Sequence, residues 1–446
     1  MNTGGSRAGA AGSDDAGAGG VDSRTVEREA TRVLEQNWRG LYTVPAGGLY
    51  PHQWSWDSAF IAIGTRHLSP RRAQQELESL LGAQWADGRL PQIVFNPRRD
   101  DDYSPGASFW RSERIPGSAP VPTAGLIQPP NHAWAALLVH EADPAESRRR
   151  GFLERAYPRL AAWHAYLRTR RSGASGLVHV VHPWESGMDN SPFWDAPLAA
   201  VAEDAGTDVP RPDLLHAHAS ERPSNAEYGK YLALAARYRD HDCDDADDAF
   251  PFRVEDPAVS ALLVRSELAL ADIARELGGR GDHGERADAL TGSLESLWHA
   301  DLGSYVARDL VSGELQPYRT VSGLVPLLVP GLTHAEDVLG LLRGERFGLG
   351  TAVLVPSADL TSGIFDVSRY WRGPSWFNTA WLIARALAER GLDRESAALG
   401  RDLCRFALSS DFAEYLHPIT GEPRGTRRFS WTAALALDLL RSRPAA

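Results

Sequence analysis

The sequence has few cysteines, no long apolar run and no excess of basic residues. Its 446 residues include only Cys243 and Cys404, which excludes a disulfide framework and a cluster of thiolate metal ligands. No run approaches the ~18 apolar residues of a membrane helix, and no cleavable apolar segment begins the chain. The formal net charge of -11 argues against a nucleic-acid surface, which would be basic. We therefore expect a cytoplasmic protein with neither membrane nor nucleic-acid partners.

Motifs for cofactors are missing as well. No Gly-x-Gly-x-x-Gly turn follows a strand-like run, which makes a dinucleotide fold improbable. There is no His-Glu-x-x-His, and the aspartate-rich stretch 240–248 lacks the glycine and distal glutamate of a calcium loop. We expect a solvated acidic loop there, no metal and no other cofactor, although an effect of a divalent ion on stability stays open.

The chain does contain helical periodicity over most of its length. Residues 1–22 are Gly, Ala, Ser and Asp with little to bury, and they predict a disordered tail. Short strand-like runs occur only at Leu177–Val181, Ile93–Phe95 and Thr351–Val355. The rest of 23–446 predicts one all-α domain of helical hairpins around a ring, with loops gathered at one end. Apolar residues recur at spacings of three and four in Thr25–Trp38, Trp56–His67, Arg71–Trp85, His132–Glu141, Phe152–Arg170, Ala226–Tyr238, Pro257–Leu277, Glu285–Trp298, Phe377–Arg390, Glu395–Leu408 and Trp431–Leu440.

The most informative stretch is 182–191, His-Pro-Trp-Glu-Ser-Gly-Met-Asp-Asn-Ser. It sets the carboxylates of Glu185 and Asp189 beside Trp184. A carboxyl group next to an indole loses hydration, so its pKa rises, and a proton held near neutral pH suits a general acid. The alternative is a glycine turn whose carboxylates are merely solvated.

Aromatic residues gather in loops before several expected helices. The chain has 14 Trp, 12 Tyr and 13 Phe, and flat rings suit stacking on the C–H faces of sugars, although most of them can simply fill a helical core. Asp57, in one such loop, can equally be a helix N-cap. The aromatic or rigid segments are 48–58, 127–132, 369–378 and 412–432.

Four motifs occur in a fixed order: Tyr-Pro-His-Gln-Trp-x-Trp-Asp from Tyr50, Trp-Glu-Ser-Gly-x-Asp from Trp184, Tyr-Trp-Arg-Gly-Pro-x-Trp from Tyr370, and Glu-Tyr-x-x-Pro-x-Thr-Gly from Glu414. Phe-Ser-Trp-Thr at 429–432 follows the last of them. Together they resemble glycoside hydrolase family 63, and most closely its small bacterial branch of glucosylglycerate and mannosylglycerate hydrolases. The resemblance implies an (α/α)6 barrel.

The resemblance also implies an inverting hydrolysis of an α-glycosidic bond. Asp189 matches the general acid and Glu414 the general base, with Glu422 as a rival for the base. An inverting enzyme holds its two carboxylates ~6.5–9.5 Å apart, so that a water fits between the base and the anomeric carbon. Glu414 is then expected to stay ionised while Asp189 keeps its proton.

Substrate binding is implied on the same grounds. Arg222 and Tyr228 match the segment that binds the glycerate carboxylate, which a guanidinium grips with two parallel hydrogen bonds. The alternative for Arg222 is pairing with Glu221 or Asp213. The other positions expected around the substrate are Tyr50, Gln53, Trp54, Asp57, Tyr103, Gln128, Tyr370, Trp371 and Trp376.

The sequence therefore predicts an enzyme that cleaves glucosylglycerate into glucose and glycerate. Mannosylglycerate, or both compounds, is the nearest alternative, because the two sugars differ only at C2. A trehalase-like activity leaves Arg222 and Tyr228 without a purpose, and a catalytically silent sugar-binding barrel conflicts with the presence of both carboxylates. Whether the chain forms a homo-oligomer stays open.

Overall fold

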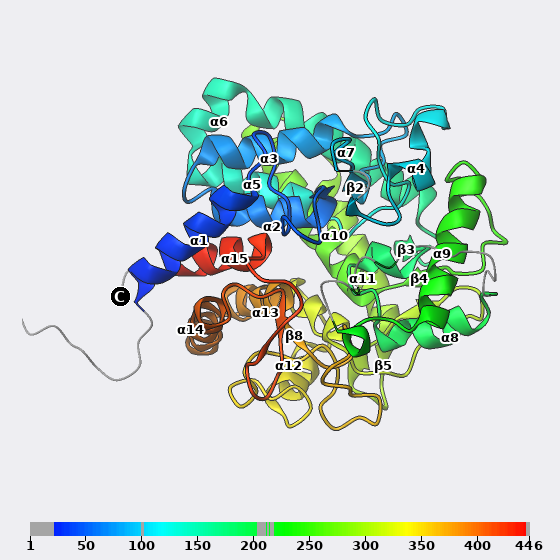
Figure 1. The fold of residues 1–446 in the computed structure, drawn as a ribbon, viewed down its shortest axis with the longest axis vertical. Helices are drawn as coiled ribbons and strands as arrows, with labels where there is room; N and C mark the ends of the chain where they lie inside the picture. The colour runs from blue at the N-terminus through cyan, green and yellow to red at the C-terminus, as the bar shows by residue number, and fades with distance from the viewer. Residues whose placement is uncertain (1–21, 100–101, 203–210, 212–213, 215–217, 443–446) are drawn as a thin grey trace, which may run out of the picture.

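A computed structural model of the protein describes residues 22–99, 102–202, 211, 214 and 218–442 (Figure 1). The expected disordered tail lies outside these residues, apart from Asp22, which caps the first helix by accepting from the Arg24 N–H at 3.1 Å. None of the helices in the described ranges is long and apolar enough to cross a membrane.

Five α-helices and one 3-10 helix form a closed inner ring. Each member contacts the next, and the last contacts the first. The inner helices are buried almost all round, and every residue of α2 is buried, as expected for helices that have neighbours on all sides. In order around the ring they are α2 (Ser55–Thr65), α5 (His132–Ala142), α10 (Pro257–Glu276), η9 (Val325–Leu328), α13 (Phe377–Glu389) and α15 (Ser430–Arg441).

Six further helices pack on the outside of this ring. Their apolar stripes face inward and their polar residues face solvent, as in α1, where Val26, Ala30, Val33 and Leu34 are buried. The first and last helices, α1 and α15, lie side by side and close the ring (Figure 1). The outer helices are α1 (Ser23–Asn37), α3 (Pro70–Gly82), α7 (Phe152–Arg170), α11 (His283–Leu294), α12 (Ala335–Arg343) and α14 (Asp393–Ser409). This arrangement of six inner and six outer elements confirms the (α/α)6 barrel.

Short helices and strands occupy the loops between the barrel helices. The short helices are α4 (Ala107–Trp110), α6 (Pro144–Arg150) and α8 (Asp195–Ala199). A longer helix outside the ring, α9 (Asn225–Asp240), has 16 residues. The strands form two pairs, β1 (Gln53–Trp54) with β2 (Ile93–Val94) and β5 (Trp298–His299) with β6 (Ser304–Tyr305). They also form two three-stranded sheets, β3 (His179–Val180), β4 (Val254–Glu255) and β7 (Arg308–Asp309), and β8 (Ser375–Trp376), β9 (Tyr415–Leu416) and β10 (Pro423–Arg424).

Three of the four sequence motifs lie in segments that lead into inner helices, whereas the motif at 184–189 follows β3. Strand β1 leads into α2, β8 leads into α13, and the segment that ends at Phe429 leads into α15. Residues from these three approaches line a single cavity. The barrel therefore brings together, at one end, segments as far apart in the sequence as those of Tyr50 and Glu414.

The helix predictions agree with the structure to within a few residues, with two kinds of difference. Helix α12 was not predicted, although its buried Ala335, Val338, Leu339 and Leu342 recur at spacings of three and four, and neither were the short helices α4, α6 and α8. The strand expected at Thr351–Val355 is absent: this segment consists of turns and bends, and Val353 donates instead to the Pro418 carbonyl at 2.8 Å.

Candidate active site

A cavity of about 930 Å³, including its opening to solvent, lies at the end of the barrel where the motif loops meet. Polar and aromatic side chains make up nearly all of its wall. The lining residues are Pro45, Leu49, Tyr50, Trp54, Trp56, Asp57, Gln92, Tyr103, Ser104, Gln128, Trp184, Gly187, Asp189, Arg222, Pro223, Tyr228, Tyr231, Tyr370, Trp376, Glu414, Phe429 and Trp431. A concave site with aromatic walls and a few convergent charges is typical of a site for a small polar ligand.

Asp189 reaches the cavity from a turn that is packed tightly from below. Gly187 has φ 71°, and a Cβ at this position would lie 2.4 Å from the Trp56 ring, so only glycine fits there. The Tyr231 hydroxyl donates to the Asp189 carbonyl at 2.6 Å and fixes the far end of the turn. Burial raises the pKa of the Asp189 carboxyl to about 7; Arg222 lowers this pKa and Glu414 raises it. Asp189 therefore carries a proton up to neutral pH.

Glu414 faces the same cavity from the start of β9. One carboxylate oxygen accepts from the Tyr50 hydroxyl at 3.0 Å, and the other accepts from the Thr426 N–H at 3.1 Å. Burial raises the pKa of Glu414 above its usual value, although Arg222 and these two hydrogen bonds oppose this shift. Hydrogen bonds donated to both oxygens favour the ionised form.

Two other carboxylates considered from the sequence lie outside the cavity. The side chain of Glu422 is 65 % exposed and lies 3.5 Å from Arg424, so Glu414 rather than Glu422 faces the cavity. Glu185, expected beside Asp189 as a candidate acid, is fully buried in an ion pair with Arg171 at 2.7 Å. Glu185 was grouped with Asp189 because the two residues lie close together in the sequence. In the structure the turn at Gly187 directs the side chains of Glu185 and Asp189 to different places.

Asp57 lies on the cavity wall in the first turn of α2. The N-cap of this helix is Trp54, and no side chain caps it. The structure therefore gives Asp57 no capping role. Burial, and next the charge of Glu414, raise the pKa of Asp57 well above its usual value. Its carboxyl is thus available to a ligand.

Aromatic rings and one amide complete this side of the cavity. The ring of Tyr103 meets that of Trp54 edge to face, with 5.1 Å between centroids, and Tyr50 meets Trp54 in the same way at 5.4 Å. The Gln128 side-chain oxygen accepts from the Trp56 N–H at 3.1 Å, which anchors that side chain beside the start of α2.

Gln53 and Trp371 were expected around the ligand, but neither lines the cavity. The Gln53 amide points under the floor, where it donates to Ser58 at 3.0 Å and accepts from Ser79 at 3.0 Å. Because β1 alternates sides, Trp54 faces the cavity and Gln53 faces the core. Trp371 has φ 60° and stacks flat on Trp376 with 3.9 Å between ring centroids. It supports the cavity wall from behind.

Arg222 is the cation of the site. Its side chain is 6 % exposed, and its guanidinium lies over the Tyr370 ring at 4.6 Å and 4.0 Å from a Glu414 oxygen. Its Nε and Nη2 are buried and have no hydrogen-bond partner among the described residues. Glu221 is not its partner, because Glu221 accepts from Tyr415 at 3.1 Å and from Arg424 at 3.2 Å. Asp213, the other partner considered, lies outside the described residues.

Tyr228 and Tyr231 project from consecutive turns of α9 into the same cavity. Tyr228 was expected there, whereas Tyr231 was missed. Its position three residues along the same helix puts it on the same face, and this spacing was the signal that could have found it. Helix α9 thus contributes both to the cavity wall and to the support of Asp189.

The described residues contain no group of three or more His, Cys, Asp or Glu side chains arranged for a metal. Two carboxyl groups, those of Asp189 and Glu414, face the same cavity as several aromatic rings, a combination typical of the hydrolytic site of a glycosidase. The fold and the cavity thus define a glycoside hydrolase.

Comparison with known proteins identifies the family. The family model described as "Mannosylglycerate hydrolase MGH1-like glycoside hydrolase domain" matches residues 50–432. The chain is 40 % identical to a mannosylglycerate hydrolase of Rubrobacter radiotolerans, over 92 % of this chain and 96 % of that one. It is 36 % identical to a glucosylglycerate hydrolase of Mycolicibacterium hassiacum, over 92 % and 96 %.

A solved structure agrees with the sequence relatives. The crystal structure of a family 63 mannosylglycerate hydrolase from Thermus thermophilus, in complex with Tris and D-glycerate, superposes with a TM-score of 0.86 at 38 % identity. The match covers 93 % of this chain and all of the other. The chain belongs to glycoside hydrolase family 63.

Proposed function

We propose that this protein is an inverting α-glycosidase that hydrolyses 2-O-α-D-glucosylglycerate to glucose and glycerate. The observation that carries this proposal is the position of Arg222 in the cavity, beside Asp189 and Glu414. Arg222 is a buried cation, and two of its donors have no hydrogen-bond partner among the described residues. A neutral disaccharide offers these donors no anion, whereas the carboxylate of glycerate does.

The physical case for Arg222 rests on burial. Arg222 lies 4.0 Å from a Glu414 oxygen, but its Nε and Nη2 donate no hydrogen bond among the described residues. Buried donors left unsatisfied are costly, and a carboxylate that forks onto them makes two charge-assisted hydrogen bonds and relieves that cost. The Tyr370 ring beneath the guanidinium adds a cation–π contact. The D-glycerate in the Thermus thermophilus structure supports a glycerate site in the family.

The proposed chemistry follows from the two carboxyl groups. Asp189 donates its proton to the glycosidic oxygen, which departs as the hydroxyl of glycerate. A water attacks the anomeric carbon from the opposite face and gives its proton to Glu414. The pKa of about 7 for Asp189 and the hydrogen bonds to both oxygens of Glu414 support this division of roles. The sugar is then released as the β anomer.

The sugar is held in this proposal by Asp57, Gln128 and the rings around Trp54. An ionised Asp57 accepts hydrogen bonds from sugar hydroxyls, and each such bond is worth about 1.5–3 kcal/mol. The indole and phenol faces pack against the C–H face of the ring. The cost of keeping Asp57 buried, seen in its raised pKa, is offset when hydroxyl donors surround it.

Mannosylglycerate is the second candidate substrate. The relative from Rubrobacter radiotolerans, at 40 % identity, is a mannosylglycerate hydrolase, and the glucosylglycerate hydrolase relative is 36 % identical. The two compounds share the glycerate and differ in one hydroxyl at C2. Arg222 therefore serves both, and the discrimination between them lies on the Asp57 side of the cavity.

The proposal is tested by measuring kcat/KM of the purified protein on glucosylglycerate, mannosylglycerate, trehalose and maltose side by side. We expect turnover of the two glycerate glycosides, with glucosylglycerate preferred, and little turnover of trehalose or maltose. Equal or faster turnover of an uncharged disaccharide would reject the glycerate site. Binding without turnover of any of the four would reject the enzymatic function.

A further inference from the structure

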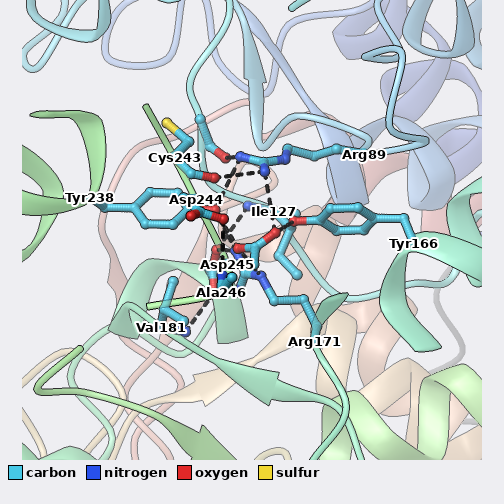
Figure 2. Close-up of polar contacts among 12 residues, drawn as sticks. Arg89, Ile127, Tyr166, Arg171, Val181, Tyr238, Cys243, Asp244, Asp245 and Ala246 are labelled. Carbon is cyan, nitrogen blue, oxygen red and sulfur yellow. Dashed lines mark hydrogen bonds and ion pairs between the residues drawn. The ribbon is translucent and has the colours of Figure 1, made fainter. Parts of the chain in front are cut away.

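A buried network of charges joins Glu185, four residues before Asp189, to the aspartate-rich stretch 240–248. Figure 2 shows the part of this network around Arg89, Arg171 and Asp245. Arg171, at the end of α7, contacts Glu185 at 2.7 Å and Asp245 at 2.6 Å. Arg89 contacts the other oxygen of Asp245 at 3.2 Å. The four side chains are at most 4 % exposed, and their charges cancel.

Asp245 departs from the expectation of a solvated acidic loop. Burial alone would raise its pKa, but Arg171 and Arg89 hold the pKa of Asp245 below its usual value. The hydroxyls of Tyr166 and Tyr238 each donate to it at 2.6 Å (Figure 2). The buried carboxylate of Asp245 therefore attaches the stretch that follows α9 to the barrel.

Glu185 is the member of the network closest to the cavity. Each of its oxygens accepts one bond from Arg171 and one from a backbone N–H. The backbone donors are Val181, at the end of β3, at 2.8 Å, and Ile127 at 3.1 Å. Ile127 precedes Gln128, which lines the cavity, and Asp189 lies four residues after Glu185. One carboxylate thus joins two loops that face the ligand.

Stability is a weak explanation for this arrangement. A buried ion pair gains little net stability, since the desolvation of both charges offsets their attraction. The four bonds to Glu185 instead specify where two loops stand relative to each other. A misplacement of about 1 Å at a reacting group can cost about 10²-fold in rate, so a carboxylate that fixes this spacing affects the chemistry directly.

We propose that Glu185 is a positioning residue, and that its carboxylate, held by Arg171, sets Asp189 at the distance from the glycosidic oxygen that proton transfer requires. This inference rests on the proposed role of Asp189 as general acid. It assigns the first carboxylate of the Trp-Glu-Ser-Gly-x-Asp motif a task distinct from that of the second.

The test compares two leaving groups in the Glu185→Gln variant. Glutamine keeps the size of the side chain, but its NH2 group replaces one carboxylate oxygen. That oxygen accepts from Arg171 and from one backbone N–H, and an NH2 group cannot accept either hydrogen bond. On glucosylglycerate, whose leaving group needs a proton, we expect kcat to fall about 10²-fold with KM nearly unchanged. On α-glucosyl fluoride, whose leaving group departs without one, we expect a loss of less than about threefold.

Asp438 offers a matched control away from the cavity. It is fully buried in α15 and accepts from Arg66 at 2.8 Å, from His67 at 3.0 Å and from Trp381 at 2.9 Å. Asp438→Asn removes a comparable buried anion, so it is expected to lower the melting temperature without any preference between the two leaving groups. Arg171→Lys keeps the positive charge but loses the two parallel hydrogen bonds to Glu185. It serves as the second test variant should Glu185→Gln fail to fold.

Measuring Asp189→Asn on the same two substrates tests the role of Asp189 as general acid separately from the positioning role of Glu185. A loss confined to glucosylglycerate supports Asp189 as the acid, and the double variant with Glu185→Gln is then expected to lose no more than Asp189→Asn alone. Equal losses of Glu185→Gln on both substrates, or additive losses in the double variant, would overturn the positioning role. Equal losses of Asp189→Asn on both substrates would overturn the acid and the inference together.

Discussion

Replacing Arg222 with methionine removes the proposed anchor of the glycerate carboxylate while keeping most of the side-chain volume. Truncating one partner of a buried, hydrogen-bonded charge pair costs about 2–5 kcal/mol. This corresponds to a fall in kcat/KM of about 30- to 5000-fold on glucosylglycerate. The loss is expected mainly in KM, since the glycerate carboxylate is held in the ground state as well as in the transition state.

The control substrate is an uncharged aryl α-glucoside, on which Arg222→Met is expected to lose less than about tenfold. Arg222 also lowers the pKa of both Asp189 and Glu414, so its removal moves both limbs of the pH profile upward. Each variant is therefore compared at its own pH optimum. Equal losses on the charged and the uncharged substrate would refute the anchor.

A matched variant controls for charge. Arg211 lies with its guanidinium 4.1 Å from the Tyr228 ring but does not line the cavity. Arg211→Met therefore removes a cation near the site without touching the proposed carboxylate position. We expect losses of a few-fold at most, and equal ones on the two substrates. A selective loss in Arg211→Met would point to a diffuse field of positive charge rather than to one anchoring side chain.

Three other predictions follow from the same geometry. The folded pKa of Asp189, about 7, lies above its unfolded value of 3.8, so the native state loses stability as pH rises from about 4 to 7, by at most about 4 kcal/mol. Asp189→Asn should therefore be more stable than the parent to chemical denaturation at pH 8 and not at pH 4, and lower stability of the variant at pH 8 would refute this. The variant should be inactive on glucosylglycerate, and the parent's kcat/KM on this substrate should fall above about pH 7. Gly425→Ala, at φ 64°, would place a Cβ 2.5 Å from a Glu414 oxygen, whereas the control Gly421→Ala, at φ 73°, would place its Cβ against the Phe406 ring. We expect kcat to drop at least about tenfold in Gly425→Ala and not in Gly421→Ala. Similar kcat values in both variants would show that Glu414 tolerates displacement. Asp57→Asn should lose about 10- to 100-fold in kcat/KM with no fall in melting temperature, because the residue caps no helix; early melting would restore the capping role.

The barrel was predictable because helical periodicity survives in a chain whose helices each bury one face or more. Helix α7 begins and ends at the predicted residues, and α10 begins at the predicted Pro257, behind Asp256, whose side chain accepts from the Ala258 N–H at 2.9 Å. The closure of the ring was not visible in this way. It depends on contacts between helices far apart in the sequence, and one inner element is only a 3-10 turn.

The sequence motifs predicted which residues lie near the cavity, but they did not predict which side chains point into it. The β1 strand carries Gln53 and Trp54 to opposite sides, and the φ of 60° at Trp371 turns that ring behind Trp376. The roles of Glu185 and Asp245 could not be inferred from local sequence, because Arg171 and Arg89, which neutralise them, come from other segments of the barrel.

The most direct test of the proposed mechanism is anomer-resolved NMR during the first minutes of glucosylglycerate hydrolysis, before the released glucose mutarotates. We expect β-glucose first, because water guided by Glu414 attacks the face opposite the bond that Asp189 helps to break. Release of α-glucose first would mean retention of configuration and would contradict the roles assigned to both carboxyl groups.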